Sequence, residues 1–154
     1  NRSFKINSVT LKTLDGSPST SIAISKGGYF EIEFEVVQDN SQANFSLILY
    51  DSEGNCLFGS LSNTEDNNYG KPMERGTYIS TCLLPGDILN AGMFSISVVG
   101  FGAHWSDQFR IDNIISFTAH DDGILRGDYY GGYSGPFRPR LKWSTRSARS
   151  AHHE

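Results

Sequence analysis

Hydrophobic and polar residues alternate along much of the chain, most regularly over residues 29–37. Large apolar side chains occupy the even positions from 30 to 36, and glutamates occupy the odd positions from 31 to 35. Successive side chains of a pleated strand point to opposite faces, so this pattern predicts a half-buried strand. Similar reasoning on later segments predicts a core that contains Phe30, Ile32, Phe34, Phe94, Ile96, Val98 and Phe117.

Further strand-like segments follow one another at intervals of about ten to fifteen residues. They are residues 4–11, 21–24, 45–51, 56–60, 77–84, 93–100, 111–119 and 137–143. Turn sequences with glycine separate several of them, at residues 15–16, 26–28 and 52–55, and glycine supplies the positive φ angles of tight hairpins. The sequence therefore predicts an all-β fold, an antiparallel β-sandwich of the immunoglobulin-like or jelly-roll kind with about eight or nine strands.

The segment from Pro85 to Gly92 departs from this alternation. Pro85 can open a helical turn and Gly92 can close it, with Ile88 and Leu89 pointing inward. We therefore expect one short helical turn near residues 85–91. Two long polar loops, residues 61–75 and 120–136, remain between the strands, and loops of that length in a compact domain are usually functional or mobile.

A chain of 154 residues has the length of one ordinary domain with one core. We expect this domain to span residues 1–143. Residues 144–154 contain no large apolar side chain, which predicts a disordered tail or a cloning scar with His152 and His153 solvated rather than bound to metal. The chain begins at Asn1 rather than Met, which favours a domain excised from a longer protein.

The net charge, the lengths of the apolar runs and the cysteine content limit the possible binding partners and the cellular compartment of the protein. The formal net charge is −4, the wrong sign for a general phosphate-backbone binder, so we expect no nucleic-acid partner. The apolar runs are far shorter than the roughly 20 residues that a membrane span needs. Cys56 and Cys82 have no zinc-binding spacing, and two free thiols are favoured over a disulfide, which suits a cytoplasmic location.

The sequence lacks the common catalytic and phosphate-binding motifs. It contains no nucleophile elbow, no Walker loop and no HExxH zinc motif, so we expect no catalytic residue, metal or cofactor. The neighbouring acids Asp121 and Asp122 could bind a hard cation or act as acid and base. Adjacent residues at a strand end point in different directions, which favours a solvated turn.

Aromatic and amide side chains are frequent in the loops and on the expected outer faces. They are Asn63, Asn67, Asn68, Tyr69, Tyr78, His104, Trp105, Tyr129, Tyr130 and Tyr133. Sugars stack their C–H patches on aromatic rings and pair their hydroxyls with amides, so these residues suit glycan binding. The same residues can also cover sheet edges or fill interfaces, and both interpretations stay open.

The carbohydrate-binding candidates are Arg75, Tyr78, His104, Trp105, Arg110 and Asn63. If Ile79, Thr81 and Leu83 face the core, Tyr78 points outward, although the opposite phase through Cys82 and Leu84 remains open. Arg75 or Arg110 could then fork onto an acidic or phosphorylated terminal group, beside a flat face of Trp105 or Tyr78. In the alternative, Trp105 packs under its own loop and Arg110 only pairs with Asp107 or Asp112.

The order of these segments resembles one known family. The phrase from Leu84 to Gly92 (LPGDILNAG) precedes a core strand, and the chain later ends a strand-like segment with Arg138 to Trp143 (RPRLKW). Over residues 3–143 the sequence is similar to the C-terminal carbohydrate-recognition domain of Wzt-type polysaccharide ABC exporters. It departs from the family pattern at Met93-Phe94, where tyrosine is frequent, a conservative change for the core.

This resemblance implies a non-catalytic β-sandwich that recognises the modified non-reducing end of an O-antigen polysaccharide. It places the domain at the cytoplasmic face of the bacterial inner membrane, beside the membrane subunit of the exporter, with the ATPase domain outside this chain. It also implies a homodimer that exchanges its last strand, from Phe137 to Trp143, with the Gly/Tyr-rich stretch before Phe137 as hinge and linker.

Two other functions stay open at this point. One is a sugar-modifying enzyme domain that uses Asp112, Asp121 or Asp122 together with His104. The other is an immunoglobulin-like adhesion module that binds only protein.

Overall fold

The computed structural model describes residues 2–64, 69–124, 126, 127, 129 and 131–149. Its strands are β1 (Phe4–Lys12), β2 (Ser21–Ala23), β3 (Gly28–Val36), β4 (Asn44–Asp51), β5 (Cys56–Leu61), β6 (Gly76–Leu84), β7 (Gly92–Phe101) and β8 (Phe109–His120). Two 3₁₀ turns, η1 (Ser62–Thr64) and η2 (Ala103–Trp105), interrupt the loops. No helix among the described residues is long and apolar enough to cross a bilayer.

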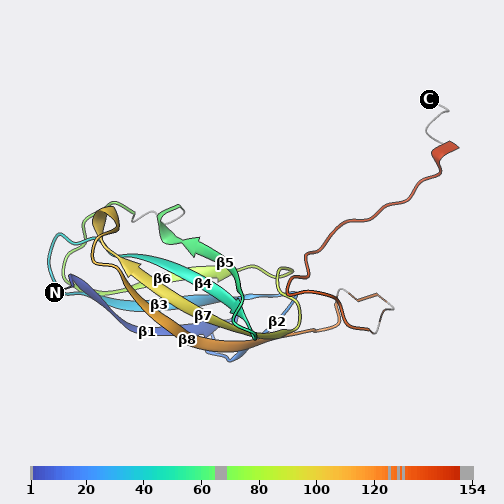
Figure 1. Cartoon of the computed structure of the whole chain (residues 1–154), viewed down its shortest axis with the longest axis horizontal. Helices are drawn as coiled ribbons and strands as arrows, with labels where there is room; N and C mark the ends of the chain where they lie inside the picture. The colour runs from blue at the N-terminus through green and yellow to red at the C-terminus, as the bar shows by residue number, and fades with distance from the viewer. Residues whose placement is uncertain (1, 65–68, 125, 128, 130, 150–154) are drawn as a thin grey trace.

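The strands form a two-layered β-sandwich, as the alternation predicts (Figure 1). One sheet has the strand order β1-β3-β6, and the other has the order β2-β8-β7-β4-β5. All pairs are antiparallel except the short β2–β8 pair, which is parallel. Strands β5 and β6 are therefore edge strands of different sheets.

The predicted core is confirmed. All seven predicted residues are at most 4% exposed, and they come from β3, β7 and β8. Phenylalanine rings fill the space between the sheets; Phe34, for example, meets Phe45 edge-on with ring centroids 4.9 Å apart. Gly100 faces inward, where the ring of Phe109 occupies the place that a larger side chain would take.

The phase of β6 is the opposite of the first expectation. Leu84 is 6% exposed, whereas Ile79 and Leu83 are 58% and 60% exposed. The reason is the pairing with β3, which sets Tyr78 beside Phe34 and Cys82 beside Phe30. Because those phenylalanines face the core, their β6 neighbours face it too.

The helical turn predicted near residues 85–91 is wrong, because this segment contains only bends and one bridge residue. The Asp87 backbone N–H donates to the carbonyl oxygen of Ile24 (2.8 Å), and the positive φ of Asp87 (64°) is incompatible with a right-handed helix. Gly86 lies against the backbone of Ser25, and Leu89 forms an isolated bridge with Phe137. Backbone groups that a helix needs are thus engaged by neighbouring segments.

Beyond one isolated bridge at its first residue, the last predicted strand does not pair with its own sandwich. Phe137 makes the bridge to Leu89, but Leu141 and Trp143 are 70% and 90% exposed. Figure 1 shows this end of the chain leaving the sandwich as an extended arm. We call residues 139–149 the C-terminal arm; pairing of its first residues with a partner subunit remains a prediction.

Candidate functional site

The outer side of the five-stranded sheet carries a row of polar and small side chains. The register aligns Ser46 with Val99 and Arg110 in one row, and Tyr50 with Ser95 and Ser116 in another. These residues lie on the phase opposite to the buried residues of β4, β7 and β8, and all are half-buried or exposed. We call this surface the polar sheet face; together with Trp105, Asp112 and Asn113, described below, it forms the candidate site.

A bulge in β8 shapes the middle of this face. The register shifts between Ile96 and Val98, so β8 carries extra residues opposite Ser97. Asn113 sits there with a positive φ of 49°, and its backbone N–H donates to Ser97 Oγ (3.0 Å). Ser95 Oγ is 3.2 Å from Asn113 Oδ1. The bulge thus presents an exposed amide beside the serines of β7.

Trp105 lies flat over one end of the polar sheet face. Its ring stacks on Phe101 with centroids 4.4 Å apart and planes at 14°, and Trp105 remains 48% exposed. Phe101 is on the outward phase of β7, so Trp105 covers this sheet rather than the core between the sheets. One ring face is supported, and about half of the residue is open to solvent.

The turn that holds Trp105 has an unusual backbone. His104, Trp105 and Asp107 have positive φ angles of 53°, 62° and 53°. Such conformations cost about 1–3 kcal/mol each for residues other than glycine. Hydrogen bonds within the loop hold the turn, including Gly102 N–H to the Ser106 carbonyl (2.7 Å) and the Gln108 side-chain amide to the Trp105 carbonyl (3.1 Å). Strained backbone of this kind gathers at active sites, ligand clamps and switch regions.

Arg110 is the charged centre of the same face. Its guanidinium donates to the Asp112 carboxylate and to the Tyr50 hydroxyl, and lies 6.0 Å from the centroid of the Tyr50 ring. The hydrogen bond to Asp112 and then that to Tyr50 raise the pKa of Arg110. The structure thus shows the pairing of Arg110 with Asp112, which balances the positive charge of Arg110 locally. Whether Arg110 also contacts a ligand stays a prediction.

The candidates Arg75, Tyr78 and Asn63 lie elsewhere. Tyr78 faces inward, stacks on Phe34 at 5.7 Å and donates its hydroxyl hydrogen to the Glu74 carbonyl (2.7 Å). Arg75 is exposed and lies near Asp39, which also accepts its backbone N–H (2.9 Å). Asn63 belongs to η1, and its Oδ1 is buried without a hydrogen-bond partner among the described residues.

A cleft of about 830 Å³ runs between edge strands β5 and β6. Its lining is mainly apolar and includes Phe45, Leu47, Met73 and Leu83, together with Tyr78. Phe45 and Leu47 occupy the inward phase of β4, whereas the polar sheet face uses its outward phase. The structure therefore brings Trp105 and Arg110 to the same face of the five-stranded sheet, with His104 exposed in the turn that holds Trp105, but it separates Tyr78 from them.

The acids that could have served catalysis are held in other contacts. Asp121 pairs with Arg138, whose hydrogen bond lowers the Asp121 pKa to about 2, with further help from the Gly123 backbone. Asp122 accepts a hydrogen bond from the Ser25 hydroxyl, and Asp112 pairs with Arg110. Among the described residues, no group of three or more His, Cys, Asp or Glu side chains could hold a metal ion.

The sequence interpretation missed Tyr50 and gave Asn113 no role. Tyr50 could have been found, because it occupies the outward phase of an alternating strand that otherwise carries small or aliphatic groups. Asn113 could not, since the bulge that presents it depends on pairing between β7 and β8. The earlier candidates Asn67, Asn68 and Tyr130 lie outside the described residues.

Comparison with known proteins agrees with the fold described above. The profile of the family described as the Wzt C-terminal domain matches residues 1–128. The crystal structure of the C-terminal domain of Wzt is similar over 95% of this chain and 86% of its own, with a TM-score of 0.75 and 14% identity. At that identity the likeness shows the fold. The chain therefore belongs to the Wzt C-terminal domain family.

Two other comparisons add no argument. A protein described as ApaA from Bordetella pertussis shares 18% identity over 78% of this chain and 94% of its own, with a TM-score of only 0.32. No curated protein matches the sequence.

Proposed function

We propose that this chain is the carbohydrate-binding domain of a Wzt-type ABC exporter subunit and recognises the modified non-reducing end of an O-antigen polysaccharide. Membership of the Wzt C-terminal domain family supports the exporter context. The observation that carries glycan binding is the exposed Trp105 ring, supported on Phe101 on the same face of the five-stranded sheet as the Arg110–Asp112–Tyr50 group.

The chemistry of the polar sheet face suits a sugar. A tryptophan face stacks against the C–H patch of a pyranose ring. Arg110 donates and Asp112 accepts, so the pair can serve both hydrogen-bonding roles of sugar hydroxyls, and Tyr50, Ser95 and Asn113 extend this set. These groups bind and orient the glycan, and the proposal includes no reaction.

The charge balance of the site favours an uncharged terminal residue. Arg110 is compensated by Asp112, so an anionic end group would meet a carboxylate at the same place as the guanidinium. The chain as a whole also carries a net charge of −4. We therefore expect neutral modified sugars to bind more tightly than phosphorylated ones.

The second part of the proposal is a homodimer that exchanges the C-terminal arm. Leu141 and Trp143 are exposed on one phase of the arm, and Arg140 and Lys142 alternate with them. A second copy offers the edge of β6 and the apolar cleft between β5 and β6. Adding an extended segment to a free sheet edge satisfies its backbone groups, while pockets for alternate side chains give specificity.

The charges of the outer face of β3 fit the same arrangement. Glu31, Glu33 and Glu35 occupy the outward phase of β3, which pairs with β6. If the apolar residues of the arm enter the cleft of the partner, Arg140 and Lys142 lie on the glutamate side of that sheet. Glu31 and Glu35 already pair with Lys12 and Lys5 of β1, so Glu33 supplies the opposite charge that favours this orientation of the arm.

In the exporter, the domain would lie at the cytoplasmic face of the inner membrane, beside the membrane subunit. The ATPase of the same subunit lies outside this chain. Binding of the finished end of a polysaccharide would select the polysaccharide chains that the exporter transports.

Calorimetric titration with O-polysaccharides of defined non-reducing ends tests the glycan proposal. We expect wild type and Arg75→Ala to bind equally, because Arg75 lies outside the polar sheet face. Trp105→Ala and Arg110→Ala should each weaken binding at least about tenfold while the sandwich stays folded at the temperature of the titration. Equal affinity in wild type, Trp105→Ala and Arg110→Ala would show that the ligand is read elsewhere, and no binding of any glycan would refute the proposal.

A further inference from the structure

Arg138 ties the root of the C-terminal arm to the end of β8. It is only 7% exposed, and its Nη1 lies 2.6 Å from Asp121 Oδ2. Its guanidinium also lies 4.1 Å above the centroid of the Tyr133 ring, and its backbone N–H donates to the Ile88 carbonyl (2.8 Å). A nearly buried arginine with a carboxylate partner is costly to release, because release breaks a charge-assisted hydrogen bond that is shielded from water.

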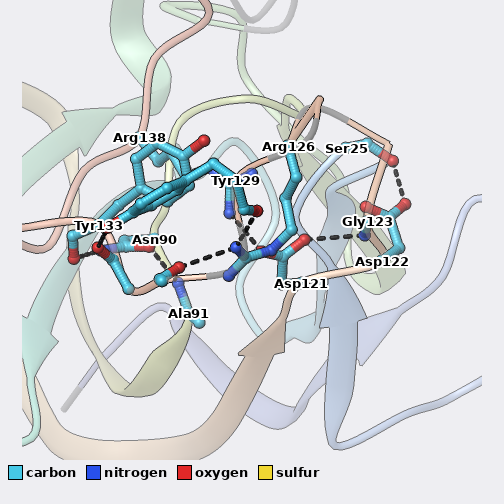
Figure 2. Close-up of polar contacts among 12 residues, drawn as sticks. Ser25, Asn90, Ala91, Asp121, Asp122, Gly123, Arg126, Tyr129, Tyr133 and Arg138 are labelled. Carbon is cyan, nitrogen blue, oxygen red and sulfur yellow. Dashed lines mark hydrogen bonds and ion pairs between the residues drawn. The ribbon is translucent and has the colours of Figure 1, made fainter.

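Asn90 holds the preceding residues from the other side (Figure 2). Its Nδ2 donates to the carbonyl oxygens of Tyr133 (2.9 Å) and Gly135 (2.6 Å). Its backbone N–H donates to the Pro136 carbonyl (2.9 Å). Asn90 is itself 7% exposed, so these bonds are shielded from water.

Arg126 fixes the earlier part of the same loop. Its Nε pairs with Asp121 Oδ2, and its Nη1 donates to the carbonyls of Tyr129 (2.9 Å) and Gly131 (2.8 Å). Asp121 thus serves both arginines with one carboxylate, as Figure 2 shows. We call Asp121, Arg126, Arg138 and Asn90 the latch.

The latch places the hinge of the arm later in the chain than the resemblance implies. The resemblance implies a hinge in the Gly/Tyr-rich stretch before Phe137, but the carbonyls of Tyr129, Gly131, Tyr133 and Gly135 are all bound by latch side chains. The first residue beyond these contacts is Pro139, which follows the anchored Arg138. Proline fixes its own φ and holds the preceding residue in an extended conformation, so the chain does not easily reverse there.

We propose that the latch makes Arg138–Pro139 the hinge and thereby favours exchange of the arm with a second copy over closure on its own sandwich. This rests on the proposed dimer. The root of the arm lies beside β5, because Phe137 stacks on Phe58 at 6.2 Å, so the cleft of its own chain is a nearby competitor. The arm runs away from the sandwich in Figure 1, so reaching the cleft of its own chain requires the chain to reverse after the root of the arm. Once the latch is open, only backbone contacts with Ile88, Leu89 and Asn90 hold residues 136–138. Their opening then lengthens the linker, and a long flexible linker permits closure within one chain, whereas a short hinge favours exchange.

The test compares Asp121→Asn with Asp122→Asn in the full chain. The Asp122 carboxylate contacts Ser25 rather than a latch arginine, so Asp122→Asn is a matched control at the neighbouring position. Light scattering over a concentration series gives the dimer dissociation constant, and hydrogen exchange reports on residues 131–138. Asn90→Ala is a second variant that opens the latch without changing a charge.

We expect Asp121→Asn and Asn90→Ala to speed exchange in residues 131–138 about tenfold or more, as loss of one hydrogen bond to a charged or shielded group implies. The dimer dissociation constant should rise in both variants and stay unchanged in Asp122→Asn. Faster exchange with an unchanged dimer would overturn the role in arm exchange, and unchanged exchange would overturn the latch itself. A wild-type chain that is monomeric at every concentration would instead refute the proposed dimer, and the role of the latch with it; glycan titration would be unaffected.

Discussion

Truncation of Phe34 to alanine tests how the two sheets hold together. Phe34 is 2% exposed and contacts three rings, with centroids 4.9 Å away for Phe45, 5.7 Å for Tyr78 and 6.4 Å for Phe4. Replacing a buried phenylalanine by alanine costs about 3–5 kcal/mol, and each lost ring pair adds about 0.5–1.5 kcal/mol beyond its area. We therefore expect a loss near the upper end, about 4–5 kcal/mol.

Urea denaturation followed by circular dichroism measures this loss of free energy, and thermal denaturation gives the melting temperature. In a domain of this size each kcal/mol corresponds to about 2–4 °C in melting temperature, so the transition should fall by about 8–20 °C. Phe34→Leu provides a milder variant, with an expected cost of about 1–2 kcal/mol, in case the alanine variant does not fold.

Two residues of the neighbouring strand β6 provide control variants for this prediction. Ile79→Ala should cost less than about 1 kcal/mol because Ile79 is 58% exposed, whereas Leu84→Ala should cost about 2–5 kcal/mol because Leu84 is 6% exposed. A cost below about 1 kcal/mol for Phe34→Ala would refute the packing. Equal costs for Ile79→Ala and Leu84→Ala would refute the register of β6.

Three further predictions concern the latch, the thiols and the arm. Because the pKa of Asp121 is lowered to about 2, its contribution to latch stability should persist at neutral pH and fade as the pH falls toward 2, and hydrogen exchange of residues 131–138 at low pH should show this in wild type but not in Asp121→Asn. Cys56 should react with a thiol reagent faster than Cys82, which is half-buried and whose pKa is raised by burial. Deletion of residues 139–154 should leave the sandwich folded but monomeric in light scattering, and a persistent dimer would contradict the exchange.

Alternation in the sequence was sufficient to predict most strands and the central core, because burial of one face imposes a period of two. It could not settle β6, where Ile79 and Leu83 compete with Cys82 and Leu84 for the inward phase. That choice depends on pairing with β3, a contact between distant parts of the chain. The predicted helical turn near Pro85 was wrong for a similar reason, because the backbone of this segment donates a hydrogen bond to Ile24 rather than within the segment.

The candidate site was only partly accessible from sequence. Trp105, in the loop between β7 and β8, and Arg110, near the start of β8, were candidates because their side chains can bind sugars. The structure places both on one face of the sheet. Tyr50 reaches Arg110 only because β4 and β8 lie on either side of β7. The latch is likewise invisible in sequence, because it joins Asn90 to carbonyls more than forty residues away.

Mapping the glycan on the isotope-labelled chain by NMR tests the central claim most directly. An O-polysaccharide fragment with a neutral modified non-reducing end should shift the indole N–H of Trp105 and the amides of Tyr50, Ser95, Arg110 and Asn113. The amides of β5 and β6, which border the cleft, should stay unchanged. Shifts confined to the cleft strands, or to the loop containing Tyr129 and Tyr133, would contradict the account.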